Sequence, residues 1–191
     1  MNICVYGAAS NKIDPVYIDA TEALGKAMAK KGHTLIFGGG AGGVMGATAR
    51  GMTSAGGEII GVAPTFFVDG VLYTGCTKFH YTETMRQRKQ VMEDSADAFI
   101  TAPGGIGTFE EFFEILTLKQ LARHQKPIVI LNIKGYYDKL LAFLEQVVAE
   151  GFMSGSCKEL YYIANTVEEA LDYLENYKFS SRSVEEYRNL R

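Results

Sequence analysis

The feature that most constrains the fold of this chain is a repeated alternation of short apolar runs with segments of helical periodicity. The apolar runs predict β-strands at residues 3–6, 34–37, 58–62, 98–101, 128–131 and 161–163. The intervening segments predict one helix that starts at Pro15 and ends before Gly32, and others over residues 44–55, 84–94, 108–123, 136–150 and 167–177. Because parallel strands need crossovers of this length, the pattern predicts an α/β fold.

The expected architecture is a Rossmann-like, doubly wound parallel sheet with helices on both faces. The strand runs are almost continuously apolar, which is typical of strands buried on both sides. No internal repeat, low-complexity tract or linker interrupts the chain. We therefore expect a single domain over residues 1–177, followed by a polar tail over residues 178–191 that is frayed or packed against a partner.

Composition excludes several classes of function. A net charge of −3 argues against a general binder of nucleic acids or membrane surfaces. No run approaches the roughly 20 apolar residues of a membrane span, and the first residues lack the basic region of a signal peptide. The three cysteines are widely spaced and the three histidines isolated, which favours reduced thiols in a cytoplasmic protein and no protein-built metal site.

Two loops with unusual composition follow predicted strands, where doubly wound folds bind their ligands. The first contains Gly7 and Ser10, and its small residues would let a phosphate or ribose approach the backbone, although an ordinary tight turn also explains them. The second, residues 38–43, includes Gly39, Gly40 and Gly43 and leads into a helix, so its N–H groups suit a phosphate. A flexible turn is the alternative, but so many glycines make it entropically costly. The loop lacks both the lysine of a Walker A loop and the acidic residue of a dinucleotide site.

A third loop after a predicted strand, residues 102–107, also leads through glycines into a helix. Two carboxylates, Glu110 and Glu111, lie in the expected first turn of that helix. One interpretation is purely structural, because Thr108 and Glu111 have the spacing of a capping box. The other is a phosphate-binding turn beside a carboxylate, which suits a phosphorylated sugar whose hydroxyls the carboxylate binds or at whose carbon it reacts.

The predicted helix over residues 84–94 is basic. Arg88 and Lys89 lie one helical turn from Met85 on its apolar stripe, whereas Arg86 points to solvent. Long basic side chains can follow the core with their stems and leave their charges in water. The functional alternative is an inward guanidinium that pairs with a phosphate or a catalytic carboxylate.

Together these motifs resemble the LONELY GUY (LOG) family, the cytokinin riboside 5′-monophosphate phosphoribohydrolases. The family's PGGxGTxxE motif is matched at residues 103–111, its Met-x-x-Arg-Lys motif at residues 85–89, and its GGGxxGLMG pattern at residues 38–46. The resemblance extends from about residue 3 to residue 177. Members of this family have often been labelled "lysine decarboxylase", but no residue here marks a pyridoxal-phosphate lysine.

The resemblance implies hydrolysis of the N-glycosidic bond of an adenosine-type 5′-monophosphate to free base and ribose 5-phosphate, without cofactor or metal. It makes Arg88 and Glu111 the catalytic pair, with Glu111 as nucleophile, base or electrostatic support, and Asp69 a candidate for an acidic residue near the base. The candidate substrate-binding residues, taken from the glycine loops and the family motifs, are Gly7, Ser10, Gly39, Gly40, Gly43, Met85, Lys89, Pro103, Gly104, Gly105, Ile106, Gly107, Thr108, Glu110 and Thr117.

Three further questions stay open at this stage. Residues 66–82 differ from the plant pattern, so AMP is as good a candidate substrate as an N6-modified AMP. A non-catalytic module that binds AMP or a related nucleotide has the same loops, whereas a nicotinamide-dependent oxidoreductase is disfavoured by the glycine spacing. The family suggests a homodimer. In addition, the helix over residues 108–123 is apolar around much of its girth, which indicates a second buried face, although a helix inside a larger core would also explain it. The apolar residues of this helix are Phe109, Phe112, Phe113, Ile115, Leu116, Leu118 and Leu121.

Overall fold

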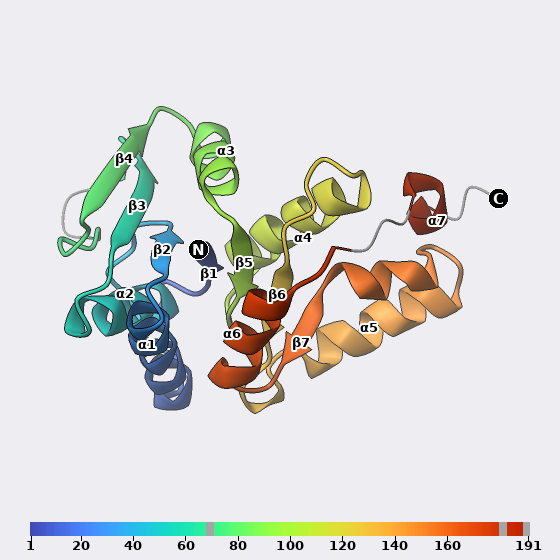
Figure 1. Cartoon of the computed structure of the whole chain (residues 1–191), viewed down its shortest axis with the longest axis horizontal. Helices are drawn as coiled ribbons and strands as arrows, with labels where there is room; N and C mark the ends of the chain where they lie inside the picture. The colour runs from blue at the N-terminus through green and yellow to red at the C-terminus, as the bar shows by residue number, and fades with distance from the viewer. Residues whose placement is uncertain (68–70, 180–182, 189–191) are drawn as a thin grey trace.

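The predicted alternation forms a seven-stranded parallel sheet with the order β4-β3-β2-β1-β5-β6-β7 (Figure 1). The computed structural model describes residues 1–67, 71–179 and 183–188. The parallel pairing and the strand order confirm the predicted doubly wound α/β fold. The strands are β1 (Asn2–Tyr6), β2 (Thr34–Phe37), β3 (Ile59–Pro64), β4 (Lys78–Thr82), β5 (Ala98–Thr101), β6 (Ile128–Leu131) and β7 (Tyr162–Ala164).

Strand β4 is absent from the sequence-based prediction. It pairs with β3 alone and forms one edge of the sheet, and most of its residues are partly or fully exposed. Its sequence, KFHYT, mixes charged and aromatic residues. An edge strand does not need the continuous apolar run by which the buried strands were recognised.

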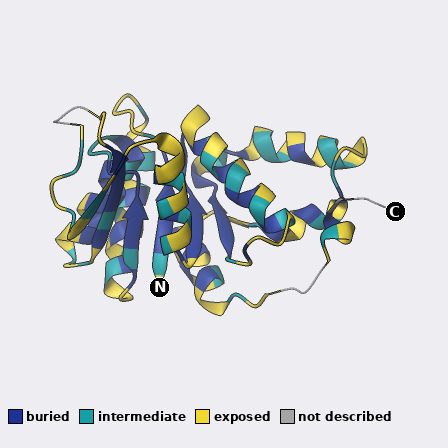
Figure 2. Ribbon diagram, turned by 90° about the horizontal axis from the view of Figure 1, so that it is seen from above, coloured by how far each residue is buried: buried dark blue, intermediate teal, exposed yellow. Residues whose placement is uncertain are grey.

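Helices cover both faces of the sheet. They are α1 (Pro15–Lys30), α2 (Gly43–Ser54), α3 (Met85–Ser95), α4 (Ile106–Gln120), α5 (Asp138–Ala149), α6 (Val167–Asn176) and α7 (Val184–Arg188), with 3₁₀ turns η1 (Ile133–Gly135) and η2 (Gly155–Leu160). Figure 2 shows the strands buried between helices whose outer faces are exposed.

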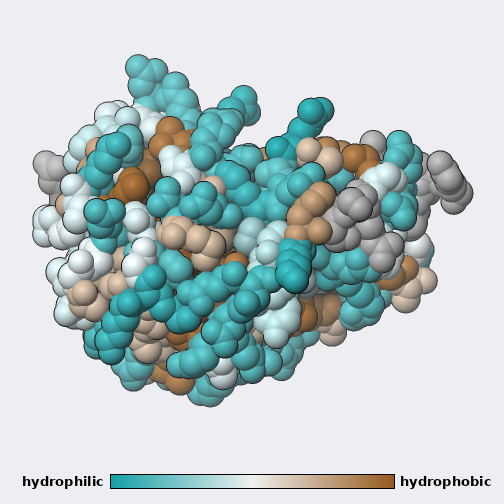
Figure 3. Space-filling view, viewed as in Figure 1, coloured by the Kyte–Doolittle hydropathy of each residue, from teal (hydrophilic) through white to brown (hydrophobic). Residues whose placement is uncertain are grey.

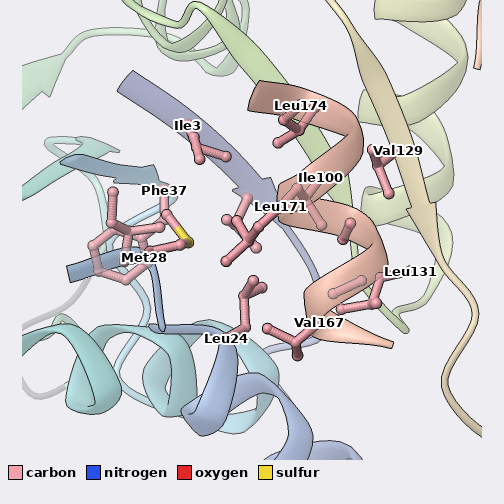
Figure 4. Packing of buried hydrophobic residues seen from close by; sticks show 14 of the residues in the cluster. Ile3, Leu24, Met28, Phe37, Ile100, Val129, Leu131, Val167, Leu171 and Leu174 are labelled. Atoms are coloured by element: carbon pink, nitrogen blue, oxygen red, sulfur yellow. The ribbon is translucent and has the colours of Figure 1, made fainter. Parts of the chain in front are cut away.

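The core has two halves, because successive strand residues point to opposite faces of the sheet. Ile3 of β1 faces α1, α2 and α6, where it packs with Leu24 and Leu171 (Figure 4). The next residue, Cys4, faces α3 and α4 on the other side, with Met92 and Phe112 in the same cluster. These two apolar clusters hold the helices against the sheet, which fixes the ends of the strands relative to the helix N-termini.

The start of α4 corrects the capping-box interpretation. This helix begins at Ile106, two residues before the predicted start, and its N-cap Gly105 makes no side-chain hydrogen bond. Thr108 and Glu111 therefore lie inside the helix and form no cap. A capping box occurs instead at α3, where Thr84 accepts from the Gln87 N–H at 3.1 Å and Gln87 accepts from the Thr84 N–H at 3.2 Å.

The described part of the C-terminal tail packs on this chain's own core, in contrast to the expected frayed or partner-packed tail. Helix α7 places Tyr187, which is 7% exposed, in the same apolar cluster as Phe112. The Gln120 side chain donates to the Tyr187 carbonyl at 3.0 Å. The division of the chain at residue 177 stays a prediction.

The surface carries no broad apolar area on the face seen in Figure 3, where hydrophobic residues are separated by hydrophilic ones. Within the described residues, no helix has the length and apolar character needed to cross a membrane.

One strained position gives a stability prediction. Ala122, just after α4, has φ 54°, a left-handed conformation that costs a residue with a Cβ about 1 kcal/mol. We expect Ala122→Gly to stabilise the protein by about that amount, measured by urea denaturation. The matched control, Ala142→Gly on the exposed face of α5, should destabilise it by about 1 kcal/mol. A loss of stability in Ala122→Gly would contradict the expected relief of strain.

Candidate active site

A cavity of about 460 Å³ lies at the carboxyl ends of the strands. Strands β1 and β5 are neighbours in the sheet, and the chain runs from β1 outward to β4 before it returns to β5. The loops after β1 and β5 therefore diverge at the topological switch point, where doubly wound folds bind their ligands. The cavity volume falls in the usual range for a small-molecule site.

The cavity brings together residues from the loops after β1, β2, β3 and β5 and from helices α2, α3 and α4. Of the predicted site residues, those that line it are Gly7, Ser10, Gly40, Met85, Arg88, Gly105, Gly107, Thr108 and Glu111. Those outside its described lining are Gly39, Gly43, Lys89, Pro103, Gly104, Ile106, Glu110 and Thr117. Asp69 lies outside the residues that the structure describes.

The cavity holds one buried ion pair. Arg88 projects inward from α3 and donates from Nη1 to Glu111 Oε1 of α4 at 2.8 Å. Its Nε also donates to the Val62 carbonyl at the end of β3, at 3.1 Å. Arg88 is 5% exposed while Arg86 is exposed, as the apolar stripe of this helix predicts. The guanidinium is thus fixed in direction by two acceptors.

Burial governs the charge state of Glu111. Removal from water raises the pKa of its carboxyl above the ordinary value of 4.5, and the neighbouring Arg88 charge and hydrogen bond oppose this rise. The net direction is upward. A carboxylate held this way, with one oxygen bonded to a fixed guanidinium, can stabilise a positive charge that develops in the cavity.

Gly38, in the loop after β2, lies directly against the Arg88 guanidinium. A Cβ at this position would overlap Arg88 Nη2. The guanidinium cannot easily withdraw, because Val62 and Glu111 hold its other nitrogens. The glycine at this position therefore leaves the space that the arginine head occupies.

This contact gives a functional prediction. We expect Gly38→Ala to displace the guanidinium from Glu111. For any reaction that depends on this ion pair, kcat should fall about tenfold or more, because small displacements of a reacting group are costly. The control is Gly155→Ala, where a Cβ would meet only Val148 at an ordinary 3.8 Å. If kcat in Gly38→Ala equalled that of the wild type and of the control on the same substrate, the reaction would not depend on the position of this guanidinium.

The two glycine-rich helix starts differ in their free N–H groups. At α2, the Gly43 N–H donates to Asn11 Oδ1 at 2.8 Å and the Met45 N–H donates to the Ala8 carbonyl at 3.2 Å. At α4, the N-cap Gly105 supplies no side-chain acceptor, so the first-turn N–H groups are left for a ligand. The start of α4, beside Thr108, is thus better able to accept an anion than the start of α2.

Lys89 and Glu110 form a surface ion cluster next to the cavity. Lys89 pairs with Glu110 and, at 2.8 Å, with Glu114. Thr117 lies on an exposed face of α4. The ion pairs of Lys89 with Glu110 and Glu114 connect α3 to α4 on the outside, whereas the Arg88–Glu111 pair connects the same two helices on the inside.

The lining also contains an apolar part outside the site residues named from the sequence, although its members lie in loops and segments noted there. It consists of Ala8, Ala9, Gly38, Met45, Phe67, Val71 and Leu72. The last three lie in the segment between β3 and β4. This segment pairs with the second glycine loop through the bridge of Leu72 with Gly40 and the hydrogen bond from the Ala41 N–H to the Val71 carbonyl at 2.9 Å. This antiparallel contact joins segments about 30 residues apart, so no local sequence pattern predicts it.

The described residues contain no cluster of three or more His, Cys, Asp or Glu side chains that could hold a metal ion. No lysine lies among the residues that line the described cavity. The pyridoxal-phosphate Schiff base of a decarboxylase needs a lysine amine at its site. The described lining does not fit that cofactor.

Comparison with known proteins places these features in one family. Residues 45–174 match the family model described as "Possible lysine decarboxylase". The chain is 40% identical over 178 residues to the probable cytokinin riboside 5′-monophosphate phosphoribohydrolase LOG6 of Arabidopsis thaliana, covering 92% of this chain and 88% of that protein. It is 38% identical over 157 residues to the cytokinin riboside 5′-monophosphate phosphoribohydrolase of Rhodococcoides fascians, covering 81% and 79%.

A solved structure shares the fold. The molybdenum cofactor carrier protein of Chlamydomonas reinhardtii superposes with a TM-score of 0.71 at 24% identity, over 91% of this chain and 95% of that one. At this identity the likeness shows the arrangement of sheet and helices alone.

Proposed function

This chain belongs to the LONELY GUY family of cytokinin riboside 5′-monophosphate phosphoribohydrolases, and from that premise we propose that its cavity hydrolyses the N-glycosidic bond of adenosine 5′-monophosphates, including N6-modified ones. The products are the free base and ribose 5-phosphate. The buried Arg88–Glu111 pair in the wall of the cavity carries this proposal.

The 5′-phosphate binds at the N-terminus of α4. Gly105, Gly107 and Thr108 line the cavity there, and the uncapped start of the helix offers N–H donors and a positive dipole end to an anion. A phosphate held at this point orients the ribose toward Glu111, one helical turn from Thr108. Binding energy from this remote group then contributes to the reaction at C1′.

Glu111 acts on the reacting carbon. Cleavage of the bond to the base gives C1′ oxocarbenium character, and a nearby carboxylate stabilises that charge. Ordinary glycosidases use two carboxyl groups, but Glu111 is the one carboxylate among the described residues that line the cavity. Arg88 fixes the direction of this carboxylate and favours its ionised form against the effect of burial on its pKa.

The base occupies the apolar part of the cavity. Phe67, Val71 and Leu72 form this wall with Met85, and such side chains suit the flat face of a purine and an apolar substituent on its N6. The same wall accepts plain adenine. Both AMP and N6-isopentenyl-AMP are therefore proposed substrates, and no cofactor is required.

A direct assay tests this function against the non-catalytic alternative. We expect the purified protein to release adenine from AMP and the modified base from N6-isopentenyl-AMP, measured by chromatography of the products. The ratio of the two rates then reports base preference. A nucleotide that raises the melting temperature without any base release would instead identify a binding module.

We also propose a homodimer built on α4. Phe112, Ile115 and Leu116 of this helix are buried within the chain, while Phe113 and Leu121 are exposed. The apolar girth noted in the sequence is thus only half covered by the chain itself, and a second copy would cover the rest.

The dimer predicts a particle of twice the 21.0 kDa chain mass in light scattering at micromolar concentration. Phe113→Glu should give a folded monomer, because it places a charge in the shared apolar face. The matched control is Phe143→Glu on the exposed face of α5. A monomeric wild-type protein would overturn the proposal.

We further infer a cytoplasmic location, in keeping with the free thiols Cys4, Cys76 and Cys157.

A further inference from the structure

Two consecutive tyrosines support the backbone of the loop between β5 and α4 from outside the cavity. The Tyr136 hydroxyl donates to the Gly104 carbonyl at 2.6 Å, and the Tyr137 hydroxyl donates to the Ala102 carbonyl at 2.7 Å. The carbonyl between them, that of Pro103, accepts from the Ala8 N–H at 3.1 Å. Three successive peptide carbonyls thus each have a dedicated donor.

These bonds fix the direction of the N–H groups as well. A trans peptide is planar, so its N–H points opposite to its carbonyl. The peptide that carries the Gly104 carbonyl also carries the Gly105 N–H. With the carbonyl held on Tyr136, that N–H points the opposite way, and Gly105 is a lining residue of the cavity. The peptide held by Tyr137 contains the nitrogen of Pro103, which has no hydrogen to direct.

The Tyr136 hydroxyl is itself held in place. Its ring packs edge-on against Tyr17 of α1, with centroids 5.6 Å apart, and against Tyr137 at 4.9 Å. The turn before it is fixed by Asn132, whose side-chain oxygen accepts from the Tyr137 N–H at 2.7 Å. Tyr136 therefore presents its hydroxyl from a rigid support.

We propose that Tyr136 is a positioning residue for the phosphate of the substrate: by holding the Gly104 carbonyl, it directs the Gly105 N–H toward the anion at the start of α4. Tyr137 has no such role, because the peptide it holds lacks an N–H. The proposal rests on the proposed function of the cavity. It assigns two adjacent tyrosines with similar hydrogen bonds to different tasks, and this difference makes it testable.

The test compares Tyr136→Phe with the matched control Tyr137→Phe in the full-length protein. Each variant loses one hydroxyl and keeps its ring. The dissociation constant for ribose 5-phosphate is measured by calorimetry, and KM and kcat for AMP are measured by base release. Because the calorimetric arm needs no turnover, it stays informative even if the protein does not hydrolyse AMP, which keeps failure of this inference separate from failure of the proposed function.

We expect Tyr136→Phe to weaken ribose 5-phosphate binding and to raise KM about five- to tenfold, with kcat within about twofold of wild type. Tyr137→Phe should leave both constants within about twofold while lowering the melting temperature, since it leaves the Ala102 carbonyl without its hydroxyl donor. Unchanged ribose 5-phosphate binding in Tyr136→Phe would overturn the proposal. An equal loss in both variants would also overturn it, because the two hydroxyls would then act only by stiffening the loop.

Discussion

Replacing Glu111 by Gln is expected to lower kcat for AMP hydrolysis about 1,000-fold while AMP still binds. The amide keeps the size of the side chain and can still accept from Arg88, but it has no negative charge to offer the oxocarbenium-like transition state. Binding persists because the phosphate site at the start of α4 contains no atom of Glu111. The measurement is single-turnover base release together with calorimetric AMP binding.

The matched control for this prediction is Glu114→Gln. Glu114 lies on the same helix, one turn further on, and its partly exposed carboxylate pairs with Lys89 rather than Arg88. This control should keep kcat within about twofold of wild type. If Glu111→Gln retained most of its activity, the carboxylate would not be the group that stabilises the reacting carbon.

Replacing Arg88 by Met is expected to lower kcat about 100-fold and to change its pH dependence. The variant loses the group that fixes the direction of the carboxylate. Arg88 also holds the pKa of Glu111 down against the effect of burial. Without this charge the pKa of the carboxyl rises further, because desolvation is no longer opposed.

The direction of the pH effect follows from the ionised form being the active one. In the wild type we expect kcat to fall as the pH drops through the pKa of Glu111, which lies above the ordinary value of 4.5. In Arg88→Met this acid limb should move to higher pH, so the activity lost is largest in mildly acidic buffer. The control is Arg86→Met, an exposed arginine two residues away on α3. An acid limb that stayed in place would contradict the coupling of the two groups.

The sequence predicted the sheet and the motif residues because both depend on local patterns. Buried parallel strands appear in the sequence as apolar runs. The start of α1 is indicated by Asp14 as the N-cap, whose side chain accepts from the Val16 N–H at 3.0 Å. Strand β4 was missed because an edge strand needs no such run. The start of α4 was misplaced because Thr108 and Glu111 have the spacing of a capping box, while the true N-cap, Gly105, makes no side-chain hydrogen bond.

The parts of the site that could not be predicted are contacts between distant segments. The family motifs named Arg88 and Glu111 as a pair, and a carboxylate was one of two partners considered for the guanidinium; that the two side chains bond directly depends on how α3 and α4 approach each other. The approach of Leu72 to Gly40 and the support of the Gly104 carbonyl by Tyr136 are likewise set by the fold. The resemblance placed both Glu110 and Glu111 at the substrate, yet only Glu111 is in the described lining of the cavity, whereas Glu110 pairs with Lys89 outside it.

The central claim is that the cavity cleaves the glycosidic bond of a nucleotide that it holds by its 5′-phosphate. The most direct measurement follows the products of AMP and of adenosine side by side, with adenine and ribose 5-phosphate each quantified by mass spectrometry. We expect adenine and ribose 5-phosphate in equal amounts from AMP, and base release from adenosine slower by on the order of 100-fold. Equal rates from both substrates, or adenine without ribose 5-phosphate, would contradict the claim.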